Sequence, residues 1–145
     1  MKSKIFLLLA VATAMFVASC EKDDAWKDHQ DFAPNKDVAG EYWVQYWVNG
    51  TPQADPSVLL IYNTASDASK IWVDDQGNFW DYKVKTNVGG TNFSVNKGID
   101  IQHDDTTTIT NGRVFGDSIS LELEWVSDPG TIYVCKGKRR TGFEK

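Results

Sequence analysis

The sequence predicts an all-β fold, an antiparallel up-and-down barrel of about eight strands. From Ala39 onward apolar residues recur with a period of two, and no stretch carries a long stripe with helical spacing. The alternating runs are short and are separated at regular intervals by turn residues. A chain of consecutive hairpins needs no long crossover, and closure into a barrel removes exposed sheet edges.

The first expected strand is Glu41–Val48, where Tyr42, Val44, Tyr46 and Val48 alternate with Trp43, Gln45 and Trp47. Asn49-Gly50 after it predicts a tight turn, because both residues tolerate positive φ. Val58–Tyr62 is a continuous apolar strand and Lys70–Asp74 a short one. The small polar residues 63–69 between them predict a loop or a single helical turn.

Asp75–Asn78 predicts a hairpin connection into a strand over Phe79–Lys85, with Trp80, Tyr82 and Val84 on one face. Phe93 and Val95, then Ile99 and Ile101, predict strand on either side of Gly98. Thr106–Phe115 is rich in β-branched residues, which favour strands. Gly116-Asp117 predicts the next turn.

Ser118–Val126 shows the clearest half-buried pattern, because Ile119, Leu121, Leu123 and Trp125 alternate with Ser120, Glu122 and Glu124. Asp128-Pro129-Gly130 then turns the chain, and Thr131–Lys138 is the last expected strand. A barrel of this size has an interior that is either filled by side chains or just wide enough for one small ligand.

Length and charge limit the possible functions. The 145 residues suffice for one domain, and the 11 glycines, 4 prolines and 41% hydrophobic content exclude a collagen-like or disordered chain. The formal net charge is −5, from 15 basic and 20 acidic residues. A nucleic-acid partner is therefore not expected, because binding it requires a positive surface.

The amino-terminal segment predicts export and anchoring. Lys2 and Lys4 precede an apolar run that is too short to span a bilayer, so residues 1–19 read as a signal peptide. Val17-Ala18-Ser19-Cys20 resembles the bacterial lipobox, which implies cleavage before Cys20 and its lipidation. Residues 20–38 then form a flexible acidic tether, and residues 39–145 form the barrel domain.

The residues after the cysteine, Glu21-Lys22-Asp23-Asp24, resemble the signal that carries Bacteroidetes lipoproteins to the outer face of the outer membrane. This resemblance implies a lipid-anchored outer-membrane protein exposed at the cell surface, with the membrane as its partner through the anchor. Cys135 is then left without a partner and is expected to be a small packed residue.

Three segments carry a wider resemblance: Gly40–Val44, Tyr62–Ala65 and Ile71–Asp75. They resemble the Bacteroidetes lipoprotein family of lipid-binding putative hydrolases, whose domains are lipocalin-like (calycin) β-barrels. The start of the domain is also similar to the lipocalin entrance, where Gly-x-Trp opens the first strand and its Trp packs on an Arg of the last. Here the tryptophan stands one position later, at Trp43, and the corresponding arginines are Arg139 and Arg140.

The sequence contains little that predicts catalysis. Its two histidines are His29, in the tether, and His103, in the polar run Gln102–Asp105, and there is no Gly-x-Ser-x-Gly elbow. His103 is therefore the candidate for a catalytic base, and enzyme activity stays an open question. No metal site or cofactor is predicted, because adjacent aspartates in turns usually cap backbone amides.

The aromatic residues are the principal ligand-binding candidates. The sheet region holds Trp43, Trp47, Trp72, Trp80 and Trp125, with Tyr42, Tyr46, Tyr62 and Tyr82 as polar tips. These rings either fill the core or line a cavity for an acyl chain or a sugar. The leading hypothesis is a surface-anchored module that binds a small hydrophobic or amphipathic, lipid-like ligand; a lipid or ester hydrolase and a glycan-accessory or protein-interaction module are the alternatives.

Overall fold

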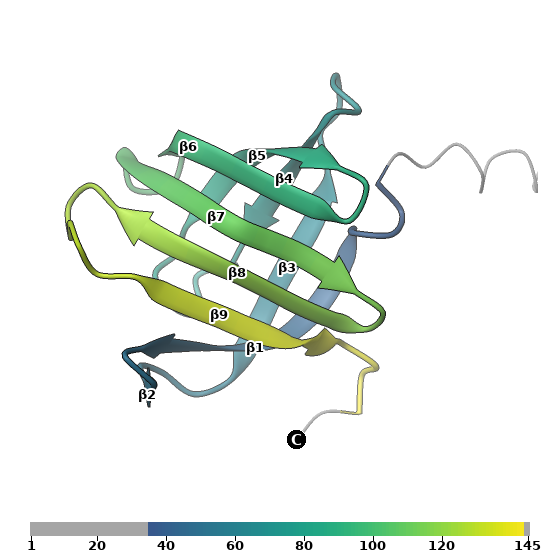
Figure 1. Ribbon diagram of the computed structural model, residues 1–145. Coiled ribbons are helices and arrows are strands. Elements are labelled where there is room, and N and C mark those ends of the chain that lie inside the picture. The colour runs from purple at the N-terminus through teal and green to yellow at the C-terminus, as the bar shows by residue number, and fades with distance from the viewer. Residues whose placement is uncertain (1–34, 144–145) are drawn as a thin grey trace, which may run out of the picture. The chain divides into compact units, whose positions relative to one another are not determined.

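The computed structural model describes residues 35–143, and the part described is all β (Figure 1). The predicted signal peptide, Cys20 and residues 21–34 of the predicted tether lie outside the described residues. The strands are β1 (Gly40–Val48), β2 (Thr51–Pro52), β3 (Ser57–Asn63), β4 (Lys70–Asp74), β5 (Lys83–Gly89), β6 (Asn92–Asp100), β7 (Asp105–Phe115), β8 (Ser118–Trp125) and β9 (Tyr133–Arg139).

The strands form one closed antiparallel barrel, which confirms the predicted fold class. Apart from the small β1–β2 hairpin, each strand from β3 onward pairs with the next, β1 pairs with β3, and β9 returns to pair with β1. Eight strands therefore make the ring, with β2 as a two-residue addition at its edge. In Figure 1, β6 to β9 cross in front of the strands of the first half.

The barrel has two different ends. The loop end carries the long connections 49–56, 75–82, 101–104 and 126–132. The N-terminal end carries residues 35–39 and the connections 64–69, 90–91 and 116–117. The Asn49-Gly50 turn has φ of +50° and +80°, as a tight two-residue hairpin requires.

Alternation separates an apolar interior from a mixed exterior. In β8 the four residues predicted to point inward are all buried, and in β1 Tyr42, Val44 and Tyr46 are buried while Trp43, Gln45 and Trp47 are only half-buried. The interior is a single hydrophobic cluster made by Val38, Tyr42, Val44, Tyr46, Leu59, Ile61, Ile71, Val73, Tyr82, Val84, Phe93, Ile109, Val114, Ile119, Leu121, Leu123, Trp125 and Cys135.

The N-terminal end is closed by the residues that precede β1. Asn35 begins a turn, and Val38 is fully buried in the core. The Tyr42 hydroxyl donates a hydrogen bond of 2.6 Å to the Val38 carbonyl. The sequence predicts a tether that continues to residue 38, whereas the packed domain already includes this turn.

Irregular pairing bends the strands on the β5–β8 side. Register shifts occur in the β5–β6, β6–β7 and β7–β8 ladders, and Lys97 and Asn111 sit there with φ of +53°. Phe93 lies opposite Gly112, and a Cβ on Gly112 would be 2.6 Å from Cε2 of the Phe93 ring. Glycine at this position lets the ring lie flat on the neighbouring strand.

One predicted strand is wrong at its start. The strand expected over Phe79–Lys85 begins only at Lys83, and Phe79–Tyr82 belong to the loop at the end of the barrel. The cause is a set of local hydrogen bonds between a side chain and the backbone of the same loop. The carboxylate of Asp75 accepts the N–H groups of Phe79, Trp80 and Asp81, which a strand would have directed to its neighbours.

Candidate functional site

The loop end of the barrel is filled by six aromatic rings that contact one another. We call them the aromatic cluster: Tyr46, Phe79, Trp80, Tyr82, Trp125 and Tyr133. Tyr46, Trp125 and Tyr133 come from strands β1, β8 and β9, and the other three come from the loop 75–82. In the cluster, side chains of the barrel strands therefore pack against side chains of the loop that covers the end of the barrel.

Phe79 is the central ring of this cluster. It stacks on Tyr46 with 4.0 Å between centroids and 9° between planes, and it also contacts Trp80, Trp125 and Tyr133. Below it, the hydroxyls of Tyr46 and Tyr82 share a hydrogen bond of 3.1 Å. A side chain of the loop thus occupies the end of the barrel interior.

The loop is held in place by one carboxylate. Asp75 is fully buried, and its oxygens accept hydrogen bonds from the N–H groups of Gly77, Phe79, Trp80 and Asp81 at 2.7–3.1 Å. Burial raises the pKa of Asp75, and the N–H groups of Trp80, Gly77 and Phe79 lower it in part. The hydrogen bonds of Asp75 therefore hold Phe79 and Trp80 in position over the end of the barrel.

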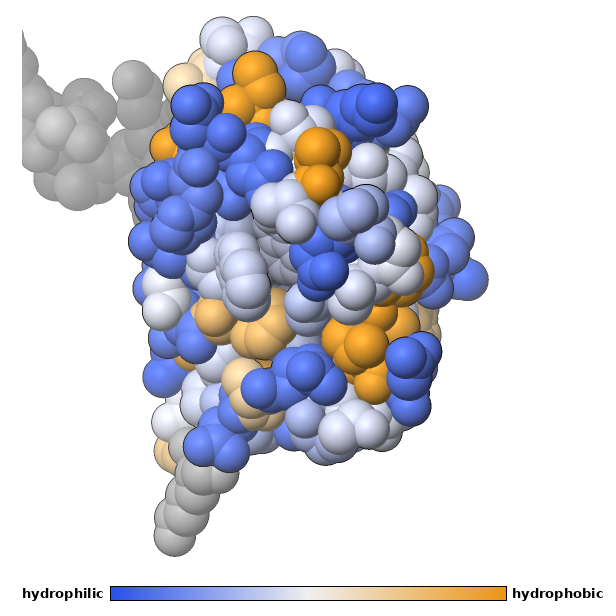
Figure 2. Space-filling view, turned by 90° about the vertical axis from the view of Figure 1, so that its left-hand side faces the viewer, coloured by the Kyte–Doolittle hydropathy of each residue, from blue (hydrophilic) through white to orange (hydrophobic). Residues whose placement is uncertain are grey.

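Apolar side chains are exposed around the same end. Figure 2 looks at it from the left-hand side of Figure 1 and shows orange apolar groups separated by hydrophilic ones. The large hydrophobic residues exposed there are Trp80, Ile99, Ile101, Val126 and Ile132. Ile99 lies at the end of β6 and the other four lie in three of the connecting loops, so together they make a discontinuous apolar rim at the end of the barrel that holds the aromatic cluster.

The interior beneath the rim is acidic rather than basic. The buried polar and charged residues of the described chain are Asp74, Asp75, Thr86, Asp100 and Thr107, with no lysine or arginine among them. Burial raises the pKa of Tyr46 and Tyr82 well above the usual range, so both phenols stay protonated at neutral pH. An anionic group would meet no buried cation there.

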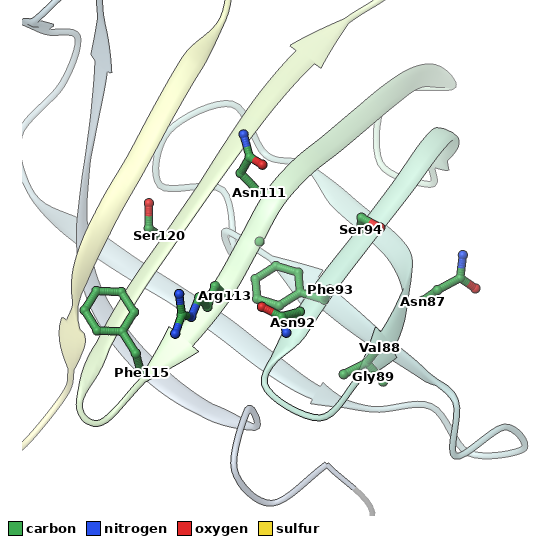
Figure 3. Close-up of a pocket in the computed structure, with 11 residues that line it drawn as sticks. Asn87, Val88, Gly89, Asn92, Phe93, Ser94, Asn111, Arg113, Phe115 and Ser120 are labelled. Carbon is green, nitrogen blue, oxygen red and sulfur yellow. The ribbon is translucent and has the colours of Figure 1, made fainter.

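A second feature lies toward the N-terminal end, on the outside of β5 to β8. A groove of about 810 Å³ is bordered by polar side chains, among them Asn92, Asn111 and Arg113, with Phe115 at one side (Figure 3). The guanidinium carbon of Arg113 lies 5.7 Å from the centroid of the Phe115 ring. Amides, a guanidinium and an exposed ring suit a polar ligand better than an acyl chain.

Comparison with known proteins identifies the family of the chain. The model of the family described as lipid-binding putative hydrolase matches residues 27–144, which is most of the chain. The protein belongs to this family. Among curated proteins no match is found. The description of the family names lipid binding. The described part of this member is a closed barrel with the aromatic cluster at one end.

In this lipid-binding family member the candidate rings divide into three groups. Tyr42, Tyr46, Tyr82 and Trp125 lie inside the barrel, all with at most 2% of their surface exposed. Trp80 stands at the rim with 47% exposed. Trp43, Trp47, Trp72 and Tyr62 are half-buried and alternate with the inward residues, so they face outward.

Two of the outward rings, Trp72 and Tyr62, contact lysine ammonium groups on the outer wall. Lys85 Nζ lies 4.8 Å from the Trp72 ring, and Lys83 Nζ lies 5.5 Å from it and 5.3 Å from the Tyr62 ring. Lys83 also pairs with Asp74 at 3.3 Å. The structure therefore brings only some of the predicted aromatic residues together, and these lie at the loop end.

The lipocalin-like contact between first and last strand is present with a different ring. The Arg139 guanidinium lies 5.0 Å from the centroid of Tyr42, which occupies the third position of Gly40-Glu41-Tyr42. Trp43, the tryptophan nearest this position, points to the other face of β1. The arginine therefore packs on the inward aromatic residue, as strand alternation requires.

His103 lies exposed in the 101–104 turn, and its Nε2 is 3.9 Å from a carboxylate oxygen of Asp81. Within residues 35–143, no three His, Cys, Asp or Glu side chains are grouped as metal ligands would be. In the same part of the chain, no helix is long and apolar enough to cross a membrane. Cys135 is buried and free, as expected.

Sequence reasoning missed Phe79, Tyr133 and Asp75 as members of the site. Alternation predicts a strand at Phe79, and Tyr133 carries no motif. A signal for Asp75 exists in the sequence, because Asp74-Asp75-Gln76-Gly77 ends a strand with turn residues that commonly accept backbone N–H groups. Its role as the anchor of a loop that covers the barrel could not be read from that signal.

Proposed function

We propose that the protein binds a small hydrophobic or amphipathic, lipid-like ligand at the aromatic cluster. The observation that carries this proposal is the position of Phe79, a loop side chain stacked within the end of a strand-built barrel. A ring supplied by a loop can leave its place without breaking any strand pairing. The space it leaves would be bordered by Tyr46, Trp125 and Tyr133.

Energetics favour an apolar ligand at this place. Displacing Phe79 exposes the apolar surface of the rings that it covers. An alkyl chain in its position covers these rings again, and the burial is favourable by about 25 cal/mol per Å² of apolar surface. Trp80 is already 47% exposed and its ring lies 5.9 Å from Trp125, so it offers a ligand contact from solvent inward. The apolar rim extends the same contact surface.

Tryptophan fluorescence tests the proposal, because the chain carries rings both at the cluster and on the outer wall. A brominated fatty alcohol bound at the cluster should quench Trp80 and Trp125. We expect the quenching to be largely lost in a Trp80→Phe/Trp125→Phe variant. The matched Trp43→Phe/Trp72→Phe variant, which changes two outward rings, should keep it.

Two results contradict the proposal. Absence of quenching in the unaltered protein, together with no lipid in native mass spectra of the protein purified from its host, would remove lipid binding altogether. Quenching that disappears in the Trp43→Phe/Trp72→Phe variant would move the ligand to the outer wall of β1 and β4.

We also propose that the protein is a lipoprotein held in the outer membrane by acylated Cys20 and exposed at the cell surface. The lipobox-like run before Cys20 and the acidic residues after it support this location. Metabolic labelling with palmitate should mark the unaltered protein and not a Cys20→Ser variant. Protease added to whole cells should remove the domain, and protection from protease would contradict surface exposure.

Hydrolysis of a lipid or ester is the second candidate function. It is favoured by the proximity of His103 and Asp81, an imidazole and a carboxylate at the end of the barrel that carries the aromatic cluster. The 3.9 Å between them is longer than a hydrogen bond, so the two side chains would have to move closer before the carboxylate could orient the histidine as a base. Turnover of a generic ester should be lost in His103→Ala, and an unchanged rate would remove this candidate.

A glycan is the remaining candidate partner. The outward Trp43, Trp47 and Trp72 and the polar groove beside Phe115 favour it, because sugars stack on rings and bond to amides. Oligosaccharide should then shift the tryptophan emission of the unaltered protein. No shift, measured also with a Trp80→Phe/Trp125→Phe variant to isolate the outer rings, would eliminate it.

A further inference from the structure

Three residues of the barrel wall near the aromatic cluster each carry a buried polar atom without a hydrogen-bond partner. Among residues 35–143, the buried side-chain atoms that lack any hydrogen-bond partner include Asp100 Oδ2, Thr107 Oγ1 and Trp125 Nε1. The three residues are at most 2% exposed. Buried polar atoms in folded proteins are nearly always hydrogen-bonded, so a group of three calls for an explanation.

Strand register places these residues together. Thr107 of β7 is directly opposite Trp125 of β8, and on its other side it is opposite Gly98 of β6. Asp100 is two residues beyond Gly98, at the end of β6, and shares the inward face with Val84. All three are therefore at the loop end, where the Trp125 ring also lies 5.7 Å from Tyr82 and 6.5 Å from Phe79.

The three atoms differ in whether they donate or accept hydrogen bonds. The Asp100 carboxylate already accepts two backbone N–H groups at its Oδ1, from Lys83 and Gln102, which leaves Oδ2 as an acceptor. The Trp125 indole nitrogen can only donate, and the Thr107 hydroxyl can do either. A ligand group that satisfies all three must both donate and accept a hydrogen bond.

Charge narrows the choice of that group. A carboxylate cannot donate to Asp100 and would lie beside a second buried carboxyl, Asp75, with no buried lysine or arginine in the described chain. An ammonium could donate to Asp100 but could not accept from Trp125. A hydroxyl donates and accepts and carries no charge, so it fits both neighbours.

We propose that the ligand of the aromatic cluster is a neutral lipid with a hydroxyl head, a long-chain alcohol or an acylglycerol, and not an ionised fatty acid. This inference rests on the proposed lipid binding and names the ligand class. The hydroxyl donates to Asp100 Oδ2 and accepts from Trp125 Nε1, with Thr107 beside it. The alkyl chain lies against the aromatic rings.

Three ligands of equal chain length test the inference: dodecanol, dodecanoate and dodecylamine, titrated at neutral pH and followed by calorimetry. We expect dodecanol to bind at least tenfold more tightly than either ionised ligand, a difference of about 1.4 kcal/mol. Asp100→Asn keeps Oδ1 and turns the other oxygen into a donor, so it should remove most of the preference.

Thr107→Val and Thr86→Val form a matched pair, because both remove a buried hydroxyl without a partner among the described residues and keep the shape of the side chain. Thr86 is on β5 opposite Ile71 of β4, whereas Trp125 is on β8. Dodecanol affinity should fall several-fold in Thr107→Val and stay unchanged in Thr86→Val.

Each outcome decides between the two proposals. If none of the ligands binds, the proposed function itself is wrong. If dodecanoate or dodecylamine binds as tightly as dodecanol, or if the Thr86→Val and Thr107→Val variants lose affinity equally, lipid binding remains and the hydroxyl preference is overturned. Circular dichroism spectra of all variants separate loss of binding from loss of folding.

Discussion

The guanidinium of Arg139 stacks on the ring of Tyr42 and joins the last strand of the barrel to the first. Its Nη1 donates to the Ala39 carbonyl at 2.7 Å and its Nη2 to the Asp37 carbonyl at 3.2 Å. Gly40 leaves room for this side chain, since a Cβ on Gly40 would collide with Nη1 of Arg139. Arg139 therefore stabilises both the contact between the first and last strands and the segment that precedes β1.

Replacing Arg139 by alanine should lower the free energy of unfolding by about 2–3 kcal/mol, because a ring contact and two hydrogen bonds are lost together. Arg140→Ala is the matched control, since the Arg140 ion pair with Glu41 is solvent-exposed and should contribute about 0–1 kcal/mol. Urea unfolding measures both. Equal losses would mean that the Tyr42 contact has no special weight.

Gly112→Ala should be strongly destabilising, by about 2–3 kcal/mol or more, because the new methyl group meets both the backbone and the ring of Phe93. Gly89→Ala, at a position on β5 with nothing within 4 Å of the added carbon, should change stability by only about 0.5 kcal/mol. Thermal unfolding compares the two, and a tolerated Gly112→Ala would show that β6 and β7 separate easily.

Phe79→Ala should destabilise the unliganded protein by about 2–4 kcal/mol, because a ring is removed from a packed cluster. If the ligand takes the place of this ring, dodecanol should recover part of the lost melting temperature and bind more tightly than to the unaltered protein. Phe115→Ala is the control, because Phe115 is 52% exposed on the outer wall. A ligand that stabilises both variants equally would contradict displacement of Phe79.

Asp75 should give stability a recognisable dependence on pH. Burial raises its pKa above the ordinary 3.8, so the folded protein keeps the proton at pH values where the unfolded chain has released it. The contribution of Asp75 to stability should therefore fall as pH rises from 3.8 through the raised value, and then stay constant. The difference in unfolding free energy between the unaltered protein and Asp75→Asn, followed over this range, measures it. A difference that grows with pH would contradict the assigned cause.

Cys135 should be inert in the folded protein. Burial raises the pKa of its thiol far above the usual range, and the thiolate is the reactive form. Iodoacetamide at mildly alkaline pH should modify Cys135 only after denaturant is added, as followed by mass spectrometry of the peptide that contains it. Rapid modification without denaturant would indicate that β9 opens in the native state.

Alternation was sufficient to predict most of the barrel. Side chains of a strand point to opposite faces in turn, so the spacing of Ile119, Leu121 and Leu123 identified the buried face of β8 before any partner strand was known. Turn residues such as Asn49-Gly50 fixed where hairpins reverse. Both effects are local, and local effects can be read from neighbouring residues.

The candidate site depended on contacts between distant segments. Whether an aromatic ring faces a core or solvent follows from alternation, but which rings meet follows from closure of β9 on β1 and from the loop that Asp75 holds. Phe79 reached the cluster because a carboxylate withdrew its backbone from the sheet. The sequence alone determined most of the strands, the anchor hypothesis and the resemblance to the family. The tertiary structure decided which rings gather at one end and which polar atoms remain unpaired beside them, because long-range pairing leaves no periodic mark in the chain.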